Sequence, residues 1–153
     1  MNKILQEKIV WINSTNKDSG TNNNFFYQIY GYLHPEAKNI TFQLINALIS
    51  PSTVARFFIV AHLKILIDFG VSHNQSNANL NNFLIGGIIS PTLTTRYLYS
   101  DVLGNPGPVY KIYGIPSGII NIRLIDETNS DLYDSAFTPP GNVTLCLKFT
   151  YEI

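Results

Sequence analysis

The chain has 153 residues with equal numbers of acidic and basic side chains, and only 13% of its residues are charged. The resulting net charge of zero argues against electrostatic nucleic-acid binding and against a polybasic membrane anchor. Hydrophobic residues make up 45% of the chain, enough for one domain with a self-sufficient core. A surface so poor in charge suits either a subunit that partners cover or a neutral globular protein that relies on Asn, Ser and Thr for solubility.

The single cysteine, Cys146, excludes an intrachain disulfide and favours a reducing compartment, so we expect a cytoplasmic protein. The N-terminus lacks the uninterrupted apolar core of a signal peptide, because charged residues interrupt it at Lys3, Glu7 and Lys8. The best candidate for a membrane span, residues 54–70, is too short and contains four polar or charged side chains. We therefore expect no membrane span.

The first 24 residues are predicted to be an N-terminal arm or first strand followed by a polar loop. Residues 8–13 (KIVWIN) are β-prone. Residues 13–24 (NSTNKDSGTNNN) have turn and loop chemistry, and Gly20 can adopt positive φ there. Residues 25–153 are predicted to form a single β-sandwich domain.

Short apolar or alternating segments follow, separated by turns rich in Gly, Pro and Asn. We expect strands over residues 25–33, 39–49, 57–69, 83–89, 96–100, 109–115, 119–125 and 143–151. Gly31 and the Gly86-Gly87 pair mark candidate bulges. The series predicts an all-β fold, an antiparallel β-sandwich arranged as a single jelly roll of about eight strands. A lectin-like or other Greek-key sandwich has the same pattern.

The stretch over residues 57–69 (FFIVAHLKILIDF) is predicted to be the central core strand. All of its odd-numbered positions are apolar, and alternate residues of a strand face the same side. Ser52 and Thr53 are also suitable caps for a helix through residues 54–66. The abundance of Ile, Val and Phe and the unbroken alternation favour the strand. In residues 39–49 the predicted inward face holds Ile40, Phe42, Leu44 and Leu48, broken by Asn46.

No catalytic motif is present, and the three histidines, His34, His62 and His73, lack the spacing of a zinc site. We expect His34 in a turn and His73 in a long polar loop over residues 70–82. Cys146 is predicted to be a buried or half-buried inert thiol. A solvated acidic loop is favoured over a calcium site for Asp126, Glu127, Asp131 and Asp134. We therefore expect no enzyme, no cofactor and no metal site.

Two short patterns stand at the ends of the sequence. The N-terminal pattern is Ile12-Asn13-Ser14, Lys17-Asp18, Gly20 and then Phe25-Phe26-Tyr27-Gln28-Ile29. The C-terminal pattern is residues 122–126 (IRLID), a polar loop and residues 145–151 (LCLKFTY). Together they resemble the jelly-roll capsid proteins of large eukaryotic DNA viruses and virophages. The chain is too short for a double jelly-roll major capsid protein. The resemblance therefore implies a non-enzymatic minor capsid or penton-type subunit.

Two functions remain open on the sequence. The first is a virion structural protein, assembled in the host cytoplasm, that contacts the major capsid protein or other capsid subunits and forms a homo-oligomer. Its contacts are expected in the N-terminal arm and in the polar loops 70–82 and 126–141. The second is a carbohydrate- or receptor-binding β-sandwich, which requires exposed aromatic side chains on one sheet face or loop rim, since aromatic rings pair apolar area with polar tips.

Overall fold

The computed structural model describes residues 3–29, 31–50, 63–75, 82–89, 97–100, 108–116, 118–126, 128–129 and 142–153. Within them the chain forms ten strands and one short 3-10 turn, and no helix long and apolar enough to cross a membrane. The elements are β1 (Leu5–Asn13), η1 (Ser14–Asn16), β2 (Ser19–Thr21), β3 (Asn24–Gln28), β4 (Lys38–Ser50), β5 (Leu63–Asp68), β6 (Leu84–Ile89), β7 (Tyr97–Ser100), β8 (Val109–Lys111), β9 (Ile119–Ile125) and β10 (Asn142–Glu152).

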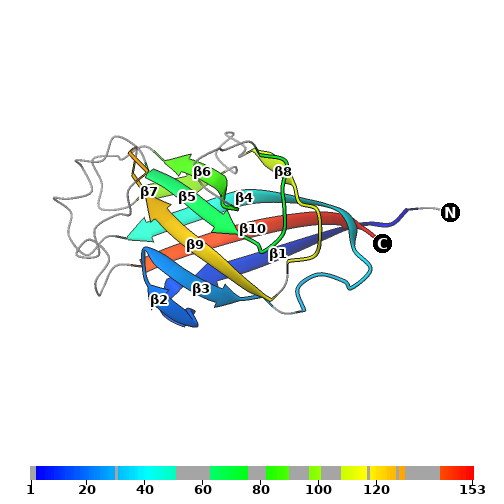
Figure 1. Cartoon of the computed structure of the whole chain (residues 1–153), viewed down its shortest axis with the longest axis horizontal. Helices are drawn as coiled ribbons and strands as arrows, with labels where there is room; N and C mark the ends of the chain where they lie inside the picture. The colour runs from blue at the N-terminus through cyan, green and yellow to red at the C-terminus, as the bar shows by residue number, and fades with distance from the viewer. Residues whose placement is uncertain are drawn as a thin grey trace.

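The strands form two five-stranded antiparallel sheets that face each other (Figure 1). Sheet A has the order β1-β10-β4-β7, with β8 also paired to β4, and sheet B has the order β2-β3-β9-β5-β6. The pairs β1–β10, β3–β9, β4–β7/β8 and β5–β6 are those of one long hairpin rolled into two layers. This strand order is a jelly roll of eight strand positions with β2 added at one edge, as the sequence predicts.

One strand position of sheet A is made from two pieces. β7 pairs with Asn46–Ile49 of β4, and β8 pairs with Thr41–Gln43 of the same strand. Both pieces run antiparallel to β4, so β8 continues the line of β7 after residues 101–108. The predicted strand over 109–115 is shorter than expected, since β8 ends at Lys111. The next residue, Ile112, forms an isolated bridge to His73, and its N–H donates to the Ile40 carbonyl.

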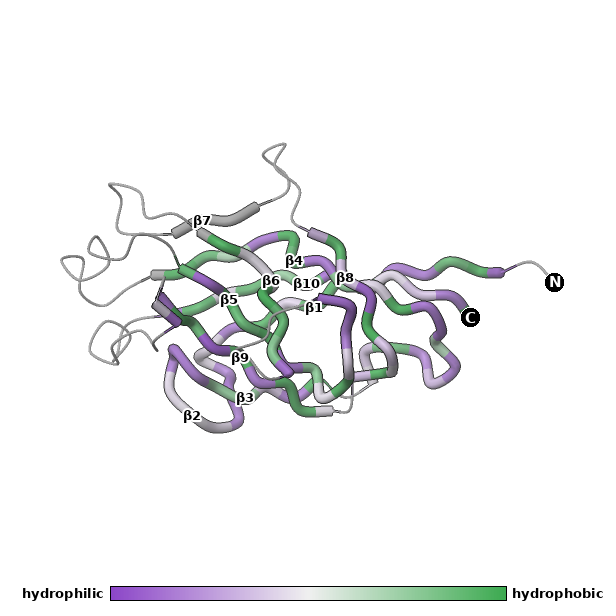
Figure 2. Tube along the Cα trace, turned by 45° about the horizontal axis from the view of Figure 1, so that its top comes forward, coloured by the Kyte–Doolittle hydropathy of each residue, from purple (hydrophilic) through white to green (hydrophobic). Residues whose placement is uncertain are grey.

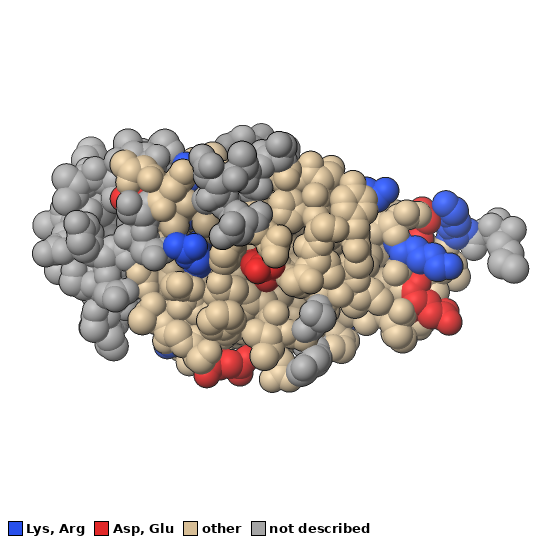
Figure 3. Space-filling view, in the orientation of Figure 1, with Lys and Arg blue, Asp and Glu red and all other residues tan. Residues whose placement is uncertain are grey.

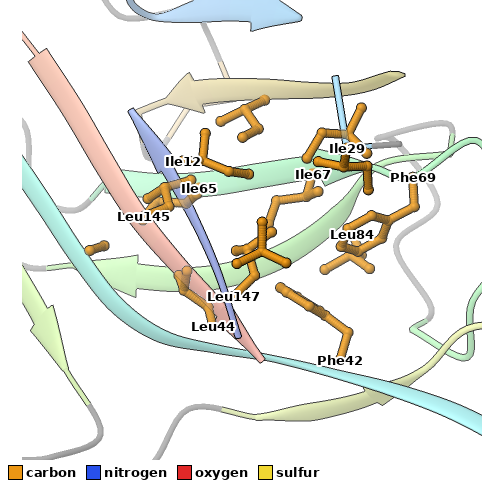
Figure 4. Close-up of a cluster of buried hydrophobic side chains, with 14 of the residues drawn as sticks. Ile12, Ile29, Phe42, Leu44, Ile65, Ile67, Phe69, Leu84, Leu145 and Leu147 are labelled. Carbon is orange, nitrogen blue, oxygen red and sulfur yellow. The ribbon is translucent and has the colours of Figure 1, made fainter. Parts of the chain in front are cut away.

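The core lies between the sheets and is filled by the inward faces of their strands. Polar and apolar segments alternate along the strands of both sheets (Figure 2), which is the period-2 pattern of half-buried strands. The predicted inward residues of the stretch 57–69 are confirmed where the structure describes them: Leu63, Ile65, Ile67 and Phe69 are all buried. Residues 57–62 lie outside the described residues. Figure 4 shows Ile65 and Ile67 pointing toward Leu145 and Leu147 of the opposite sheet.

Three phenylalanine rings close one part of this core. Phe42 of β4, Phe69 after β5 and Phe149 of β10 are each at most 1% exposed. The ring centroids are 4.8 Å apart for Phe42 and Phe69, 5.6 Å for Phe69 and Phe149, and 5.8 Å for Phe42 and Phe149. The two shorter contacts are edge-to-face, the arrangement that aromatic quadrupoles favour. The cluster thus joins the two sheets.

A bulge in β4 overturns part of the predicted inward face. Between the pairs Cys146–Asn46 and Leu147–Leu44 the register shifts, so that β4 carries one extra residue, Ile45. Because one extra residue reverses the alternation, Ala47 and Ile49 are buried beyond the bulge and Leu48 is not among the core residues. The prediction that Leu48 faces the core is therefore wrong.

Glycine positions account for two further local outcomes. The bulge at Gly86-Gly87 is confirmed, because the β5–β6 register skips Gly86, where a Cβ would lie 3.1 Å from Ile67 Cδ1. Gly31 forms no bulge. β3 ends at Gln28, opposite the first residue of β9, and Gly31 lies in the following turn with a φ of 73°. The predicted polar loop over residues 13–24 also contains the short strand β2, which the sequence pattern did not indicate. Gly20 of β2 has the expected positive φ.

The N-terminal segment contributes strands to both sheets. β1 pairs with β10 over nine residues, and Val10 and Ile12 are buried in the core. β2 pairs with β3 in sheet B. Of the two alternatives for this segment, an arm or a first strand, residues 5–13 are a strand within the sandwich.

Candidate interaction surface

Among the described residues no group of three or more His, Cys, Asp or Glu side chains is placed to hold a metal ion. His34 lies in the expected turn, where its Nδ1 accepts from the Glu36 N–H. His73 lies in a bridge to Ile112; its Nδ1 accepts from the Gln75 N–H, so its Nε2 donates to the Asn82 carbonyl. Both histidines therefore stabilise local turn and loop conformations through hydrogen bonds to the backbone. His62, Glu127, Asp131 and Asp134 lie outside the described residues.

Cys146 is buried, as the sequence predicts, on the outer side of sheet A between Trp11 of β1 and Asn46 of β4. Cys146 is only 1% exposed, so its thiol is not accessible to a substrate. The Asp126 carboxylate accepts from both the N–H and the hydroxyl of Thr128, so it closes a local turn.

An apolar pocket of about 470 Å³ opens at one end of the sandwich. The segment after β3 and the segment before β9 form its walls, and Phe149 forms part of its floor. The lining has no carboxylate, histidine, lysine or cysteine: Ile29, Gly31, Tyr32, Leu33, Pro35, Ile115, Pro116, Gly118 and Phe149. Tyr32 carries the one titratable side chain among these lining residues.

The outer side of β1 presents an exposed apolar row, and we call Leu5, Ile9 and Trp11 the β1 row. Their side chains are 67%, 44% and 59% exposed. Because β1 alternates, the next residues Val10 and Ile12 point the other way into the core. The run KIVWIN thus directs one set of apolar residues into the core and leaves the other set exposed. Neighbouring exposed apolar side chains are typical of interaction surfaces.

β1 also lies at a free edge of its sheet, since β10 is its one strand neighbour among the described residues. Exposed edges promote pairing with other chains, and proteins shorten, bend or cover them. β1 has nine residues, no proline and an uninterrupted register with β10. Its charged residues are Glu7, which forms an ion pair with Lys148 at 3.6 Å, and Lys8.

The other described edges are short or covered. The side-chain amide of Gln75 accepts from the Ile85 N–H and donates to the Ile85 carbonyl, so it occupies part of the β6 edge as a strand would. Backbone bonds from Asn74 to Lys111 and from Tyr113 to Ser72 cover β8. β2 has three residues. By comparison, β1 is the long and uncovered edge in the part of the chain that the structure describes.

Charged side chains gather at the end of the molecule that holds both termini (Figure 3). Lys3 lies 3.2 Å from the carboxylate of Glu152, and the Asn39 amide donates to the same carboxylate at 2.8 Å. These hydrogen bonds, that of Asn39 first and that of Lys3 second, hold the pKa of Glu152 below its ordinary value. Asn39 reaches this position with a positive φ of 51°. These contacts join Lys3 and Asn39 to Glu152 of β10.

The Ile12-Asn13-Ser14 motif fixes the end of β1 to β10. The Ser14 side chain is fully buried, and its Oγ accepts from the Val143 N–H at 2.9 Å. Asn13 caps η1 through its Oδ1 and donates from Nδ2 to the Thr144 hydroxyl. The motif is therefore a structural clamp between two segments that are far apart in the sequence.

We expect Ser14→Ala to lower the free energy of unfolding by about 1–3 kcal/mol, because it leaves the buried Val143 N–H without an acceptor. Urea unfolding measures the effect. The exposed neighbour Thr15, whose hydroxyl donates to Asn13, provides the control, and Thr15→Ala should change stability by less than about 0.5 kcal/mol. Equal effects of the two substitutions would contradict the clamp.

No family model and no curated protein match the chain. Among solved structures it is similar to the extra small virus of the giant freshwater prawn Macrobrachium rosenbergii, studied as a virus-like particle, with 10% identity over 95% of this chain and 79% of that chain, at a TM-score of 0.29. It is also similar to tomato aspermy virus, with 7% identity over 94% of this chain and 76% of that chain, at a TM-score of 0.30. A third similar structure is the decameric BFDV capsid protein, with 9% identity over 99% of this chain and 97% of that chain, at a TM-score of 0.24. The strand order of the two sheets, and not these similarities, identifies the fold.

Proposed function

We propose that this protein is a non-enzymatic virion structural protein, a minor capsid or penton-type subunit of an icosahedral capsid. The observation that carries the proposal is the β1 row, an exposed apolar row on a long uncovered edge strand. Apolar side chains beside unpaired backbone groups favour burial against another protein, and a charge-poor surface does not oppose it. Its partners are other capsid subunits, including the major capsid protein, and its location is a virion assembled in the host cytoplasm.

The positions of the two resembling sequence ends support this proposal. Ile12-Asn13-Ser14 is clamped to β10, and β10 contains residues 145–151 of the C-terminal motif. Residues 25–28 lie in β3, which pairs with β9, and β9 contains residues 122–125. The N-terminal and C-terminal motifs therefore lie in two strand pairs, β1–β10 in sheet A and β3–β9 in sheet B.

The test is cryo-EM of particles assembled from this chain together with the other capsid proteins of its own genome. We expect density for a ten-stranded sandwich within the shell, in contact with the major capsid protein. Particles that are complete and contain none of this chain would overturn the proposal.

A glycan array tests the carbohydrate-binding function in parallel. That function requires exposed aromatic side chains along one face. Among the described residues, Trp11 lies on β1 of sheet A, Phe26 on β3 of sheet B, and Tyr113 follows β8. Because these three side chains lie on different elements, we expect no binding on the array. Binding that Trp11→Ala or Tyr113→Ala abolishes would favour the carbohydrate-binding function instead.

A further inference from the structure

The backbone bond from the Ile153 N–H to the Ile4 carbonyl shows which groups of β1 face its free edge. Leu5 is opposite Glu152, so Ile4 and Ile153 are a directly opposed pair. Opposed residues of antiparallel strands alternate between bonded and non-bonded pairs. Even-numbered residues of β1 therefore direct their backbone groups to β10. At the other end of β1, the Val143 N–H donates to the hydroxyl of Ser14, which is also an even-numbered residue. This bond agrees with the same alternation.

It follows that the odd-numbered residues of β1 direct their N–H and carbonyl groups away from the sheet. These are the residues whose side chains form the β1 row, together with Glu7 between them. No described residue forms a backbone bond to them on that side. Leu5, Ile9 and Trp11 thus present both an apolar side chain and an unpaired backbone edge. An extended strand is the occupant that satisfies both.

The sequence of β1 is complementary to itself when two copies run antiparallel about Val10. In this register Ile9 of one copy lies opposite Trp11 of the second copy, and the two-fold axis repeats the pair. Glu7 then lies opposite Asn13. Shifting the axis to Lys8 or to Glu7 would place two like charges opposite each other, and shifting it to Ile9 would place Glu7 opposite Trp11.

We propose that β1 pairs with β1 of a second copy of this chain, antiparallel and centred on Val10, and joins the two A sheets into one. Such a two-fold contact is isologous and closes as a dimer. The inference rests on the proposed function in that it names the surface by which one subunit meets the next. It favours a minor capsid subunit that bridges neighbours over a ring-forming penton subunit.

The test is sedimentation velocity of the full chain with edge variants, with circular dichroism to establish the fold. The wild type should be a dimer in the micromolar range. Ile9→Pro should raise the dimer dissociation constant about 30-fold or more, because it removes an N–H directed at the partner and leaves the β10 ladder intact. Ile9→Glu should do the same, because it places a carboxylate against the apolar ring of Trp11, whose face repels negative charge. Ile119→Glu, at a 49% exposed isoleucine on the other sheet, is the matched control and should leave the dimer unchanged.

A charge exchange tests the register. Ile9→Glu and Trp11→Lys should each weaken the dimer, and the double variant should restore it, because each introduced glutamate then faces an introduced lysine of the other copy. Failure of the double variant to restore the dimer would overturn the register. A wild type that is monomeric, or a dimer that survives Ile9→Pro with native melting, would overturn the pairing. Either result leaves the capsid proposal standing, since cryo-EM of particles tests that role separately.

Discussion

Replacing Phe42 with alanine should lower the free energy of unfolding by about 3–5 kcal/mol. The ring is fully buried between the sheets and contacts Phe69 and Phe149, with centroids 4.8 Å and 5.8 Å away. The substitution removes one of the largest fully buried side chains of the described residues. It also removes the edge-to-face contact with Phe69, which adds about 0.5–1.5 kcal/mol to the contribution of the buried area. A marginally stable domain of this size has about 5–15 kcal/mol in total.

Chemical denaturation measured by fluorescence or circular dichroism gives this value directly. The matched control is Phe26→Ala on β3, because Phe26 is 42% exposed on the outer side of sheet B. Its loss should cost less than about 1 kcal/mol. If Phe42→Ala were no more destabilising than Phe26→Ala, the two sheets would not pack through this cluster.

Replacing Ile65 with alanine should cost about 2–5 kcal/mol for the same reason in the opposite sheet. Ile65 is fully buried on β5, and it lies opposite Leu124 of β9 and points toward Leu145 across the core (Figure 4). The surrounding strands are fixed by hydrogen bonds on both sides of β5, so the cavity cannot collapse fully.

Ile88→Ala provides the comparison, because Ile88 has the same chemistry, lies on the neighbouring strand β6 and is 51% exposed. It should change stability by less than about 1 kcal/mol. A near-neutral effect of Ile65→Ala would show that the odd-numbered residues of β5 do not face the core, and the register of sheet B would then be wrong.

The alternating strands were predictable from sequence because each has one face in the core and one outside. β10 illustrates this best, since Val143, Leu145, Leu147, Phe149 and Tyr151 are all buried as the alternation predicts. β9 follows the same rule with Ile120, Ile122 and Leu124. A period of two residues is a local property, so it is readable without knowledge of the strand partners.

The bulge at Ile45 was not predictable, because it depends on how β4 matches β10 about a hundred residues later in the chain. The inward turn of Ala47 and Ile49 follows from that non-local match. Leu66 is buried although it lies on the more polar face of β5, and its neighbours across the sheet are Arg123 and Ile85. Alternation within one strand cannot report the burial that neighbouring strands provide.

The candidate interaction surface was only partly readable. The run KIVWIN is apolar on both of its faces, and this is the signal that a strand has something to bury on its outer side. The sequence predicted contacts in the N-terminal arm, where β1 lies, and in the polar loops 70–82 and 126–141, and much of those loops lies outside the described residues. What the sequence could not give is that β1 stands at a sheet edge, because edge position depends on the whole strand order.

Sedimentation velocity of the purified wild-type chain across the micromolar range, beside Ile9→Pro, tests the central claim most directly. We expect a dimer for the wild type and a folded monomer for Ile9→Pro, with the same circular dichroism spectrum. A wild type that stays monomeric at every concentration would contradict the pairing of β1 with a second copy of the chain.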